Sequence, residues 1–378
     1  MEPRVKILHI INGLNGGGAE TMLYKLLSHI DRAAFENEVV SLTDIGTIGK
    51  SIQALGVRVH ALGMVRGLPM PGALWQLVSI IRSLRPHRIQ GWMYHSNLAA
   101  TVAGLLTPEP TQVLWNIRHT PYDFEDYKPI TATTIRLGAY LSRFPAWILY
   151  NARTSAVYHE ALGYDAARRM VLPNGFDMVQ FAPSAESRAS VRSELGVDQE
   201  ALLVGLVARF HPQKDHRNFV QAAARFHAYA AKTHFLLCGD GITWENPELV
   251  GWIEAAGIRD WCHLLGRRDD IPRLTAALDI ASTASSAEAF PNVIGEAMAC
   301  AVPCVVTDVG DSAIIVGETG IVVPPKDPQA LADGWRRLLL DMSREERLQL
   351  GLVARQRIRE RYSLGKVVGQ YERLYESL

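Results

Sequence analysis

Short β-branched apolar runs alternate along this chain with longer segments whose apolar residues recur at helical spacing. Residues 5–11 form the first run, residues 12–18 a glycine-rich turn, and residues 19–30 place their apolar side chains on one helical face. Strand, turn and helix repeated in this order predict parallel sheets with helices on both faces. The expected strands are 5–11, 38–42, 57–61, 88–92, 113–118, 202–208, 234–238, 262–265, 280–282, 305–307 and 321–323, and the expected helices are 19–30, 48–55, 74–84, 97–106, 219–231, 247–256, 271–277, 292–300 and several between 328 and 378.

The alternation weakens between residues 176 and 196, where turn residues gather, and then starts again. A chain of 378 residues also exceeds what one hydrophobic core usually fills. We therefore predict an α/β protein with two Rossmann-like domains in tandem, residues 1–182 and residues 183–361. Ligands of open parallel sheets bind beyond the carboxyl ends of the strands, so two such domains that face each other would form a deep cleft.

Composition excludes few classes of protein. The chain is 48% hydrophobic and 21% charged with a net charge of zero, which is typical of a globular protein and gives no sign of a nucleic-acid partner. Residues 1–182 carry 17 Lys and Arg against 13 Asp and Glu, whereas the remainder carries 22 against 26. A charge difference this small between the two halves is more simply incidental than a means of attracting the first half to an anionic membrane or acceptor.

The four cysteines all lie in the second half and have no partners at zinc-binding spacing. They are too few for a secreted disulfide scaffold, so we expect buried free thiols, no metal site and a cytoplasmic protein. No apolar run free of charges reaches membrane length, so any membrane contact is expected to be peripheral, on the inner face of the cell membrane. For residues 136–150, two interpretations stay open: an aromatic and basic stretch that touches a membrane, or a core helix followed by a strand.

Two acids flank an expected helix start in the second domain. Glu288 follows a strand end, and Glu296 lies about one turn inside the helix that begins near Asn292. Backbone amides at a helix start suit a phosphate, while carboxylates beside them suit sugar or ribose hydroxyls. By spacing alone, a helix with an ordinary capping acid is the simpler interpretation.

Two cations follow the expected strand 202–208. Arg209 comes directly after this buried strand, and Lys214 lies further along the same loop. Cations beyond a strand end can neutralise a diphosphate and stabilise it as a leaving group. Solvated surface charge is the alternative, and it fits Lys214 better than Arg209.

The first domain offers a glycine loop and two histidines. Gly17 and Gly18 precede a helix start and permit close backbone approach, although the loop is not a dinucleotide fingerprint and could be an ordinary tight turn. His95 and His119 each follow an expected strand, on the cleft side of the domain. Each could act as an acid or base or bind acceptor hydroxyls, with a packing role as the alternative.

In combination, these residues resemble the family 4 glycosyltransferases, retaining enzymes of the two-domain GT-B fold, over essentially the whole chain. The resemblance implies a last helix, residues 362–378, that crosses back onto the first domain. One departure is Ile314, where the family usually has an acid. The motifs that carry the resemblance are GGGAE (16–20), PNGFD (173–177), VARFHPQKD (207–215), CGDG (238–241), GRRDDIP (266–272), EAFPNVIGEAMACAVPCVVTDVGD (288–311) and GIVVPPKDP (320–328).

The resemblance also implies roles for individual residues. Arg209 and Lys214 would bind the donor diphosphate, Glu288 the donor sugar and Glu296 the ribose, with His119, Arg209, Lys214 and Glu288 as the catalytic group. His95, Asn97 and His119 would meet the acceptor. The remaining donor-binding residues would be Gly17, Gly18, Gly239, Arg268, Phe290, Pro291, Asn292, Val293 and Ile294.

The expected reaction is transfer of a sugar from a nucleotide diphosphate donor to a glycan or lipid-linked glycan, with front-face attack and retention of configuration. No metal or other cofactor is expected, because side-chain cations replace the metal. A UDP-sugar is favoured over GDP-mannose by its frequency in the family. Two alternatives remain: a nucleotide-sugar epimerase or hydrolase of the same fold, which would convert donor without acceptor, and a catalytically silent binding subunit, which would lack a key site residue.

Overall fold

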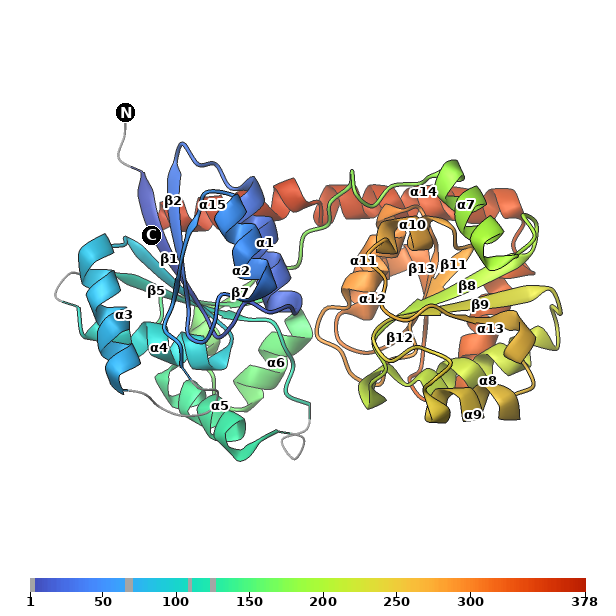
Figure 1. Cartoon of the computed structure of the whole chain (residues 1–378), viewed down its shortest axis with the longest axis horizontal. Coiled ribbons are helices and arrows are strands. Elements are labelled where there is room, and N and C mark those ends of the chain that lie inside the picture. Colours follow the sequence, from blue (N-terminus) through green and yellow to red (C-terminus); the bar gives the residue numbers. More distant parts are fainter. Residues whose placement is uncertain (1–3, 65–70, 108–110, 123–126) are drawn as a thin grey trace. The chain divides into compact units, whose positions relative to one another are not determined.

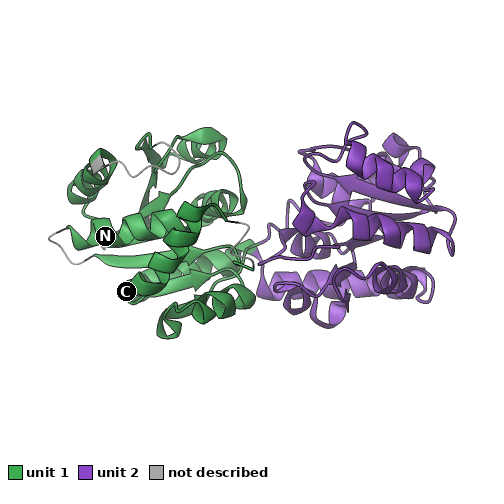
Figure 2. Cartoon of the chain, turned by 90° about the horizontal axis from the view of Figure 1, so that it is seen from below, with its two compact units in different colours: residues 1–175, 364–378 green, residues 176–363 purple. Residues whose placement is uncertain are grey.

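The computed structural model describes residues 4–64, 71–107, 111–122 and 127–378, and it divides the chain into two compact units. Unit 1 comprises residues 1–175 and 364–378, and unit 2 comprises residues 176–363 (Figure 2). The boundary predicted from sequence lies after residue 182. In the structure the chain passes between units at Gly175, and the amide of the next residue, Phe176, donates to the carbonyl of Tyr362 at 2.8 Å.

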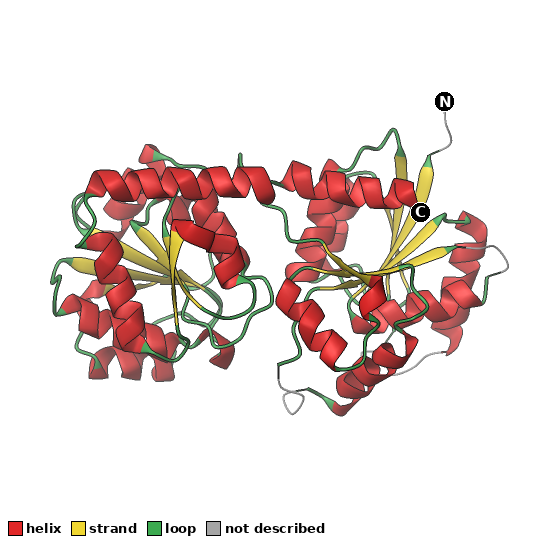
Figure 3. Cartoon of the chain, turned by 180° about the vertical axis from the view of Figure 1, so that it is seen from behind, coloured by secondary structure: helices red, strands yellow, loops and turns green. Residues whose placement is uncertain are grey.

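Among its described residues, unit 1 contains a seven-stranded parallel sheet in the order β3-β2-β1-β4-β5-β6-β7, with helices on both faces (Figures 1 and 3). The chain reverses its direction of growth between β1 and β4, as in other doubly wound folds. The bounds are β1 Val5–Ile11, α1 Gly18–His29, β2 Phe35–Ser41, α2 Gly46–Ala54, β3 Arg58–Ala61, α3 Pro71–Leu84, β4 Arg88–Trp92, α4 Tyr94–Leu105, β5 Gln112–Ile117, α5 Pro129–Leu141, β6 Trp147–Tyr150, α6 Arg153–Ala161, η1 Ala166–Arg168, β7 Arg169–Val171 and α15 Leu364–Ser377.

Unit 2, all of whose residues are described, contains a six-stranded parallel sheet in the order β10-β9-β8-β11-β12-β13. Its switch point lies between β8 and β11, which pair directly through Val204 and Ile280. The bounds are α7 Ala185–Leu195, β8 Leu202–Val207, η2 Pro212–Lys214, α8 His216–His227, β9 Thr233–Cys238, α9 Pro247–Ala255, η3 Arg259–Trp261, β10 Cys262–Leu264, α10 Ile271–Ala276, β11 Ile280–Ser282, α11 Asn292–Ala299, β12 Cys304–Thr307, α12 Ser312–Val316, η4 Gly317–Thr319, β13 Gly320–Val323, α13 Pro328–Leu339 and α14 Arg344–Arg361.

The prediction of two Rossmann-like domains is confirmed, and so is the return of the last helix to unit 1. Helix α15 packs on the sheet of unit 1, where the Tyr371 hydroxyl accepts a hydrogen bond from the Asn116 amide at 3.0 Å. The four cysteines are free and buried, as expected. Burial raises the pKa of the Cys238 thiol to about 11, which keeps it in the unreactive neutral form at neutral pH.

Near the domain boundary, strand β6 agrees with the interpretation of residues 136–150 as a helix followed by a strand, whereas α6, β7 and α7 were not predicted. Strands β6 and β7 are short, and helix α7 has a polar sequence whose apolar residues show little helical periodicity. Its ends do carry local signals, because the Ser184 hydroxyl accepts from the Ser187 amide and Gly196 closes the helix in the left-handed conformation. Capping residues could therefore have identified α7 where periodicity did not.

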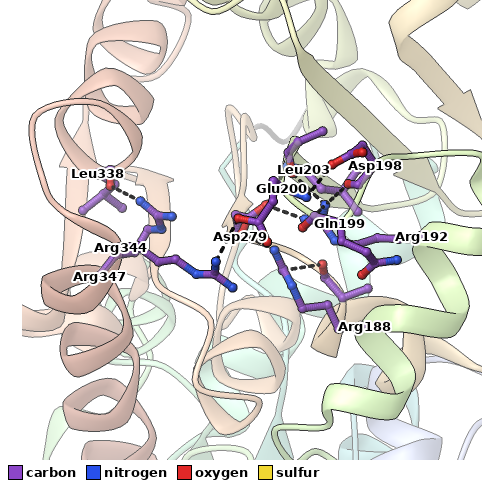
Figure 4. A network of polar contacts seen from close by, with 12 residues as sticks. Arg188, Arg192, Asp198, Gln199, Glu200, Leu203, Asp279, Leu338, Arg344 and Arg347 are labelled. Carbon is purple, nitrogen blue, oxygen red and sulfur yellow. Dashed lines mark hydrogen bonds and ion pairs between the residues drawn. The ribbon is translucent and has the colours of Figure 1, made fainter.

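A group of buried charges joins α7 to the sheet of unit 2 (Figure 4). The Asp279 carboxylate accepts hydrogen bonds from Arg192 at 2.6 Å, from Arg188 at 2.9 Å and from the Leu203 amide at 2.8 Å. The Arg192 guanidinium is fully buried and also donates to the carbonyl of Ala201 at 2.6 Å. Asp279 therefore ties together α7 and the starts of β8 and β11.

His9 in β1 gives unit 1 a stability that depends on pH. The ring is fully buried; its Nδ1 accepts from the Trp92 indole at 3.3 Å, and its Nε2 lies 3.0 Å from the Asn37 amide oxygen. Burial lowers the pKa of His9 from 6.5 to about 4, with the Asn37 hydrogen bond opposing the shift. The folded state thus holds the neutral ring, and protonation would place a second N–H against the Trp92 donor.

We expect this stabilisation to be complete above pH 6.5 and to decrease as the pH falls toward 4, since only the unfolded chain binds the proton in that window. At pH 5 the loss from His9 alone should be about 2 kcal/mol. An NMR titration of the ring, with His9→Gln to assign its signal, measures the pKa directly. A midpoint near 6.5 would contradict the prediction.

Candidate active site

The candidate site of unit 2 lies at the switch point of its sheet. Loops at the carboxyl ends of the neighbouring strands β8 and β11 carry Arg209, Lys214 and Glu288. Open α/β sheets bind ligands at this place because the loops diverge there and leave a crevice. Pairing of the two strands thus brings Lys214 and Glu288 together although they lie 74 positions apart in sequence.

Lys214 and Glu288 form an ion pair in the centre of this site. The Lys214 ammonium donates to Glu288 Oε1, and the same oxygen accepts from the Ser285 hydroxyl at 2.8 Å. Both side chains are partly buried, with 24% of Lys214 and 13% of Glu288 exposed. Because an ammonium has three donors, Lys214 can hold Glu288 and still bind a phosphate oxygen.

Backbone contacts hold Glu288 in place. The Ser286 amide donates to the carbonyl of Gln213 at 2.8 Å, which fastens the β11 loop to the β8 loop. On the other side Gly310 has a φ of +57°, and an added Cβ would lie 2.6 Å from the Glu288 carbonyl oxygen. Neither Ser285 nor Gly310 was predicted as a site residue, although Gly310 lies within the motif at 288–311, because a serine three residues before an acid and a glycine after a strand are common.

Helix α11 begins directly after this loop, with Pro291 at its N-cap. The first-turn amides of Asn292, Val293 and Ile294 have no i−4 acceptor within the helix and form the positive end of its dipole, although that of Ile294 donates to the Pro291 carbonyl at 3.3 Å. Glu296 lies one turn further along the helix and is partly exposed. The residues predicted to bind the phosphates and the ribose therefore lie on the same helix, within about one turn of its start.

Phe290 has a packing role in the structure. Its ring stacks on Phe176 with centroids 6.2 Å apart and meets the edge of Tyr362 at 5.9 Å, and only 7% of it is exposed. Gly295 makes room for this cluster, because a Cβ there would lie 2.1 Å from the Phe176 ring. Phe290 thus anchors the start of α11 to the segments where the chain enters and leaves unit 2.

Arg209 and Arg268, both predicted to bind donor, differ in their surroundings. Arg209 is exposed, and across the described parts of the chain no hydrogen bond or ion pair involves its guanidinium. Arg268 is held by Asp270 and Glu194, each at 2.8 Å. These hydrogen bonds raise the pKa of Arg268 and lower that of Asp270. Arg209 is the cation available at the strand end, whereas Arg268 fastens its loop to α7.

Gly239 supports the loop that carries Arg209. Its φ is +155°, and a Cβ would lie 2.1 Å from the carbonyl oxygen of Ala208, a backbone atom that cannot move aside cheaply. We expect Gly239→Ala to destabilise unit 2 by about 3 kcal/mol and to displace the end of β8. Gly251→Ala is the matched control: nothing lies within 4 Å of that position in α9, so it should be neutral or stabilising by about 0.5–1 kcal/mol. Urea unfolding measures both, and equal stabilities would contradict the assigned role of Gly239.

The acceptor candidates lie in unit 1. His119 Nε2 is 2.5 Å from the Tyr127 hydroxyl, and His95 Nε2 is 3.4 Å from the Thr134 hydroxyl. Burial lowers the pKa of His95, so its ring is neutral at neutral pH. Asn97 is only 1% exposed, and its amide oxygen accepts from the Asn116 backbone at 3.3 Å, so the structure places it behind the surface. Tyr127 was missed by the sequence analysis, since its contact with His119 is tertiary.

The glycine loop of unit 1 leads from β1 into α1. Gly18 begins the helix, Gly17 is extended, and Gly16 has a φ of +137°, a backbone conformation that favours glycine. A Cβ at Gly18 would meet nothing within 4 Å. The loop therefore leads into a helix start at the switch point of unit 1, where the Glu20 carboxylate lies beside Gly17.

The described residues contain neither a membrane-spanning helix nor a cluster of metal ligands. No helix in them is long and apolar enough to cross a membrane. No group of three or more His, Cys, Asp or Glu side chains in this part of the chain stands close enough together to hold a metal ion.

The chain has two Rossmann-like units, and unit 2 places a cation, an acid and a helix start at the switch point of its sheet. This combination is that of the GT-B glycosyltransferases. Family comparison agrees: the sequence model of Glycosyltransferase Family 4 matches residues 16–180, and that of Glycosyl transferases group 1 matches residues 201–341. The chain belongs to this glycosyltransferase family. It is a transferase that uses a nucleotide-sugar donor in glycan biosynthesis.

Among individual proteins, the chain is 24% identical over 327 residues to the glycosyltransferase EpsF of Bacillus subtilis, covering 80% of this chain and 79% of EpsF. It is 29% identical over 326 residues to the D-inositol 3-phosphate glycosyltransferase of Corynebacterium urealyticum, covering 79% and 74%. The fold matches HepE of Anabaena, crystallised with UDP, with a TM-score of 0.87 at 22% identity, covering 99% of this chain and 100% of that one.

Proposed function

We propose that the enzyme transfers a hexosyl group from a UDP-sugar, with retention of anomeric configuration and without a metal ion, to a glycan or lipid-linked glycan. The observation that carries the proposal is the Lys214–Glu288 pair beside the start of α11 at the switch point of unit 2. A cation and helix amides suit a diphosphate, and an adjacent carboxylate suits sugar hydroxyls.

In the proposed reaction, the bond between the sugar C1 and the diphosphate oxygen breaks, and the acceptor oxygen forms the new bond on the same face. The acceptor proton passes to the leaving phosphate. Lys214, Arg209 and the first-turn amides of α11 stabilise the negative charge that develops on the diphosphate. These groups take the part that a metal ion would play, and His119 is assigned to the acceptor.

UDP is favoured over GDP by the relatives. HepE has been crystallised with UDP and with UDP-glucose, the latter at a TM-score of 0.83. An Escherichia coli relative, 28% identical over 157 residues, is a galactosyltransferase whose name gives a UDP-Gal donor and a diphosphoundecaprenol acceptor. A lipid-linked acceptor is confined to a bilayer, so peripheral contact of a cytoplasmic enzyme with the membrane is part of the proposal.

A thermal-shift panel of nucleotides and nucleotide sugars tests the donor. A ligand at a hundred times its Kd stabilises the folded protein by about 2.7 kcal/mol, so UDP should raise the melting temperature well above the effect of GDP. A shift with GDP alone would favour a GDP-mannose-dependent mannosyltransferase, and no shift with any nucleotide would overturn the donor assignment. Donor consumption without an acceptor, followed by NMR, would instead indicate an epimerase or hydrolase.

A further inference from the structure

A cavity of about 390 Å³ lies in unit 2 between α7, α14 and the end of the sheet at which β11 and β12 begin. Lys214 and Glu288 lie in loops at the opposite end of this sheet, where the parallel strands have their carboxyl ends. A cavity of this size is within the range of small-molecule pockets, roughly 300–1,000 Å³. It is therefore large enough for a ligand and separate from the candidate donor site.

Three arginines line the cavity. Arg188 comes from α7, and Arg344 and Arg347 come from the first four residues of α14, with Asp279 between the two helices (Figure 4). Burial is the main cause that lowers the pKa of Arg347; the charge of Asp279 opposes it, and the charges of Arg188 and Arg344 lower the pKa further. The three guanidinium groups are thus close enough to repel one another, and a bound anion would relieve this repulsion.

Arg347 is the arginine of this group that has no acidic partner. Only 9% of the residue is exposed, and within the described part of the chain its one hydrogen bond goes to the carbonyl of Leu338 at 3.2 Å. A guanidinium has five N–H donors, so Arg347 keeps donors for a ligand. A charge buried this far is costly unless an opposite charge pairs with it, which a bound anion would supply.

Two acids line the cavity among the described residues, and other groups already engage both of them. The oxygens of Asp279 accept hydrogen bonds from Arg188 and Arg192, one each. The Glu345 carboxylate accepts from the Gln349 amide at 3.1 Å. Three arginines against two acids leave one positive charge in excess on the side chains that line the cavity.

The surroundings of the cavity add to its positive potential. The first residues of α7 and α14 line it, so the positive ends of two helix dipoles lie there. The acids Glu186 and Glu346 also belong to these first turns, but the Glu346 carboxylate caps its own helix through Ser343. Arg344 pairs with Glu200 at 2.9 Å, but the two side chains are 61% and 75% exposed, so water screens this pair and a ligand can displace it.

The rest of the cavity wall is largely apolar. Leu348 and Leu352 lie one turn apart on α14, are 53% and 51% exposed, and line the cavity together with Val302. The backbone of α14 comes close to this wall at Gly351, where an added Cβ would overlap the carbonyl oxygen of Ala301. Along α14 the lining therefore changes from cations in the first turn to apolar side chains in the turns that follow.

We propose that this cavity binds a phosphomonoester whose organic part is apolar. Arg344 and Arg347 would donate to the phosphate oxygens, since the planar fork of a guanidinium matches phosphate geometry with paired hydrogen bonds. Leu348 and Leu352 would cover the organic part and remove apolar surface from water. The proposed site is additional to the donor site and does not depend on it, because the two lie at opposite ends of the sheet.

The test is calorimetric titration of the full chain with four probes: phenyl phosphate, inorganic phosphate, benzoate and phenol. We expect phenyl phosphate to bind about tenfold more tightly than inorganic phosphate, because its ring is buried against the apolar wall. Benzoate, which carries a single charge, should bind more weakly than phenyl phosphate, and phenol should not bind measurably. Tighter binding of benzoate than of phenyl phosphate would overturn the assignment to a phosphate.

Variants assign the binding to this cavity. Arg344→Gln and Arg347→Gln should each lower the affinity for phenyl phosphate about tenfold, since each removes a charge-assisted hydrogen bond to the phosphate. Leu348→Asn/Leu352→Asn should weaken phenyl phosphate and leave inorganic phosphate unchanged. The matched control is Arg359→Gln, which removes an exposed arginine at the other end of α14 and should change neither affinity.

Two further measurements separate this site from unfolding and from the donor site. Arg344→Gln should keep the wild-type melting temperature, because the side chain that it replaces is 61% exposed. Arg209→Ala/Lys214→Ala should lose affinity for UDP but keep that for phenyl phosphate, so the two sites fail independently. Absence of phenyl phosphate binding by the wild-type chain would overturn the proposal, as would equal affinity in all variants or loss of binding in Arg209→Ala/Lys214→Ala.

Discussion

Lys214→Ala is expected to lower kcat/KM for sugar transfer by a factor of about 10² to 10³, the range found when one donor to a developing oxyanion is removed. Lys214 is partly buried and paired with Glu288, whereas the neighbouring Arg209 is exposed and makes no such pair. The loss should appear in both the affinity for UDP and kcat, because the diphosphate is present in the ground state and gains charge in the transition state. Steady-state kinetics and calorimetric titration with UDP measure the two quantities.

Glu288→Gln distinguishes binding of the donor sugar from binding of the nucleotide diphosphate in the proposed donor site. This variant keeps the shape of the side chain but removes its charge, so it should reduce transfer strongly while UDP, which carries no sugar, still binds. Lys232→Ala is the control, since Lys232 is an exposed lysine of the same unit and its loss should change neither quantity. Full activity of Lys214→Ala or Glu288→Gln would remove that residue from the site.

Asp279→Ala is expected to destabilise unit 2 by about 3–5 kcal/mol. The change leaves the fully buried Arg192 guanidinium without its counter-charge and removes the acceptor of the Leu203 amide (Figure 4). Loss of one partner of a buried pair costs more than the pair contributes, because the remaining charge stays in a poorly solvated place. Urea unfolding, with hydrogen exchange of the β8 and β11 amides to localise the effect, measures the loss.

Glu254→Ala is the matched control for Asp279. Glu254 and Arg259 also lie 2.6 Å apart, but their side chains are 56% and 52% exposed. Solvent screens such a pair, so its removal should cost less than about 1 kcal/mol. If the two variants lost similar amounts of unfolding free energy, burial would not explain the contribution of Asp279 to stability.

Elements with strong local patterns could be predicted from sequence, and those that depend on packing could not. Buried parallel strands such as β1 and β8 are continuous apolar runs, which made them recognisable. Helix α7 was missed because its stability comes from Arg188 and Arg192, which reach Asp279 far along the chain. The structural role of Arg268 could not be predicted for the same reason, because its partner Glu194 lies 74 positions away in sequence.

The sequence by itself determined the two Rossmann-like domains and the residue types of the candidate site, because periodicity and motif order are local properties. The return of the last helix followed from the family resemblance. Only the tertiary structure decided which of those residues meet. Pairing of β8 with β11 brings Lys214 to Glu288 and Ser285, and packing turns Phe290 and Asn97 inward. Packing also leaves Ile130, Leu137 and Tyr140 of α5 exposed, since burial depends on which neighbours cover a helix and not on its own residues.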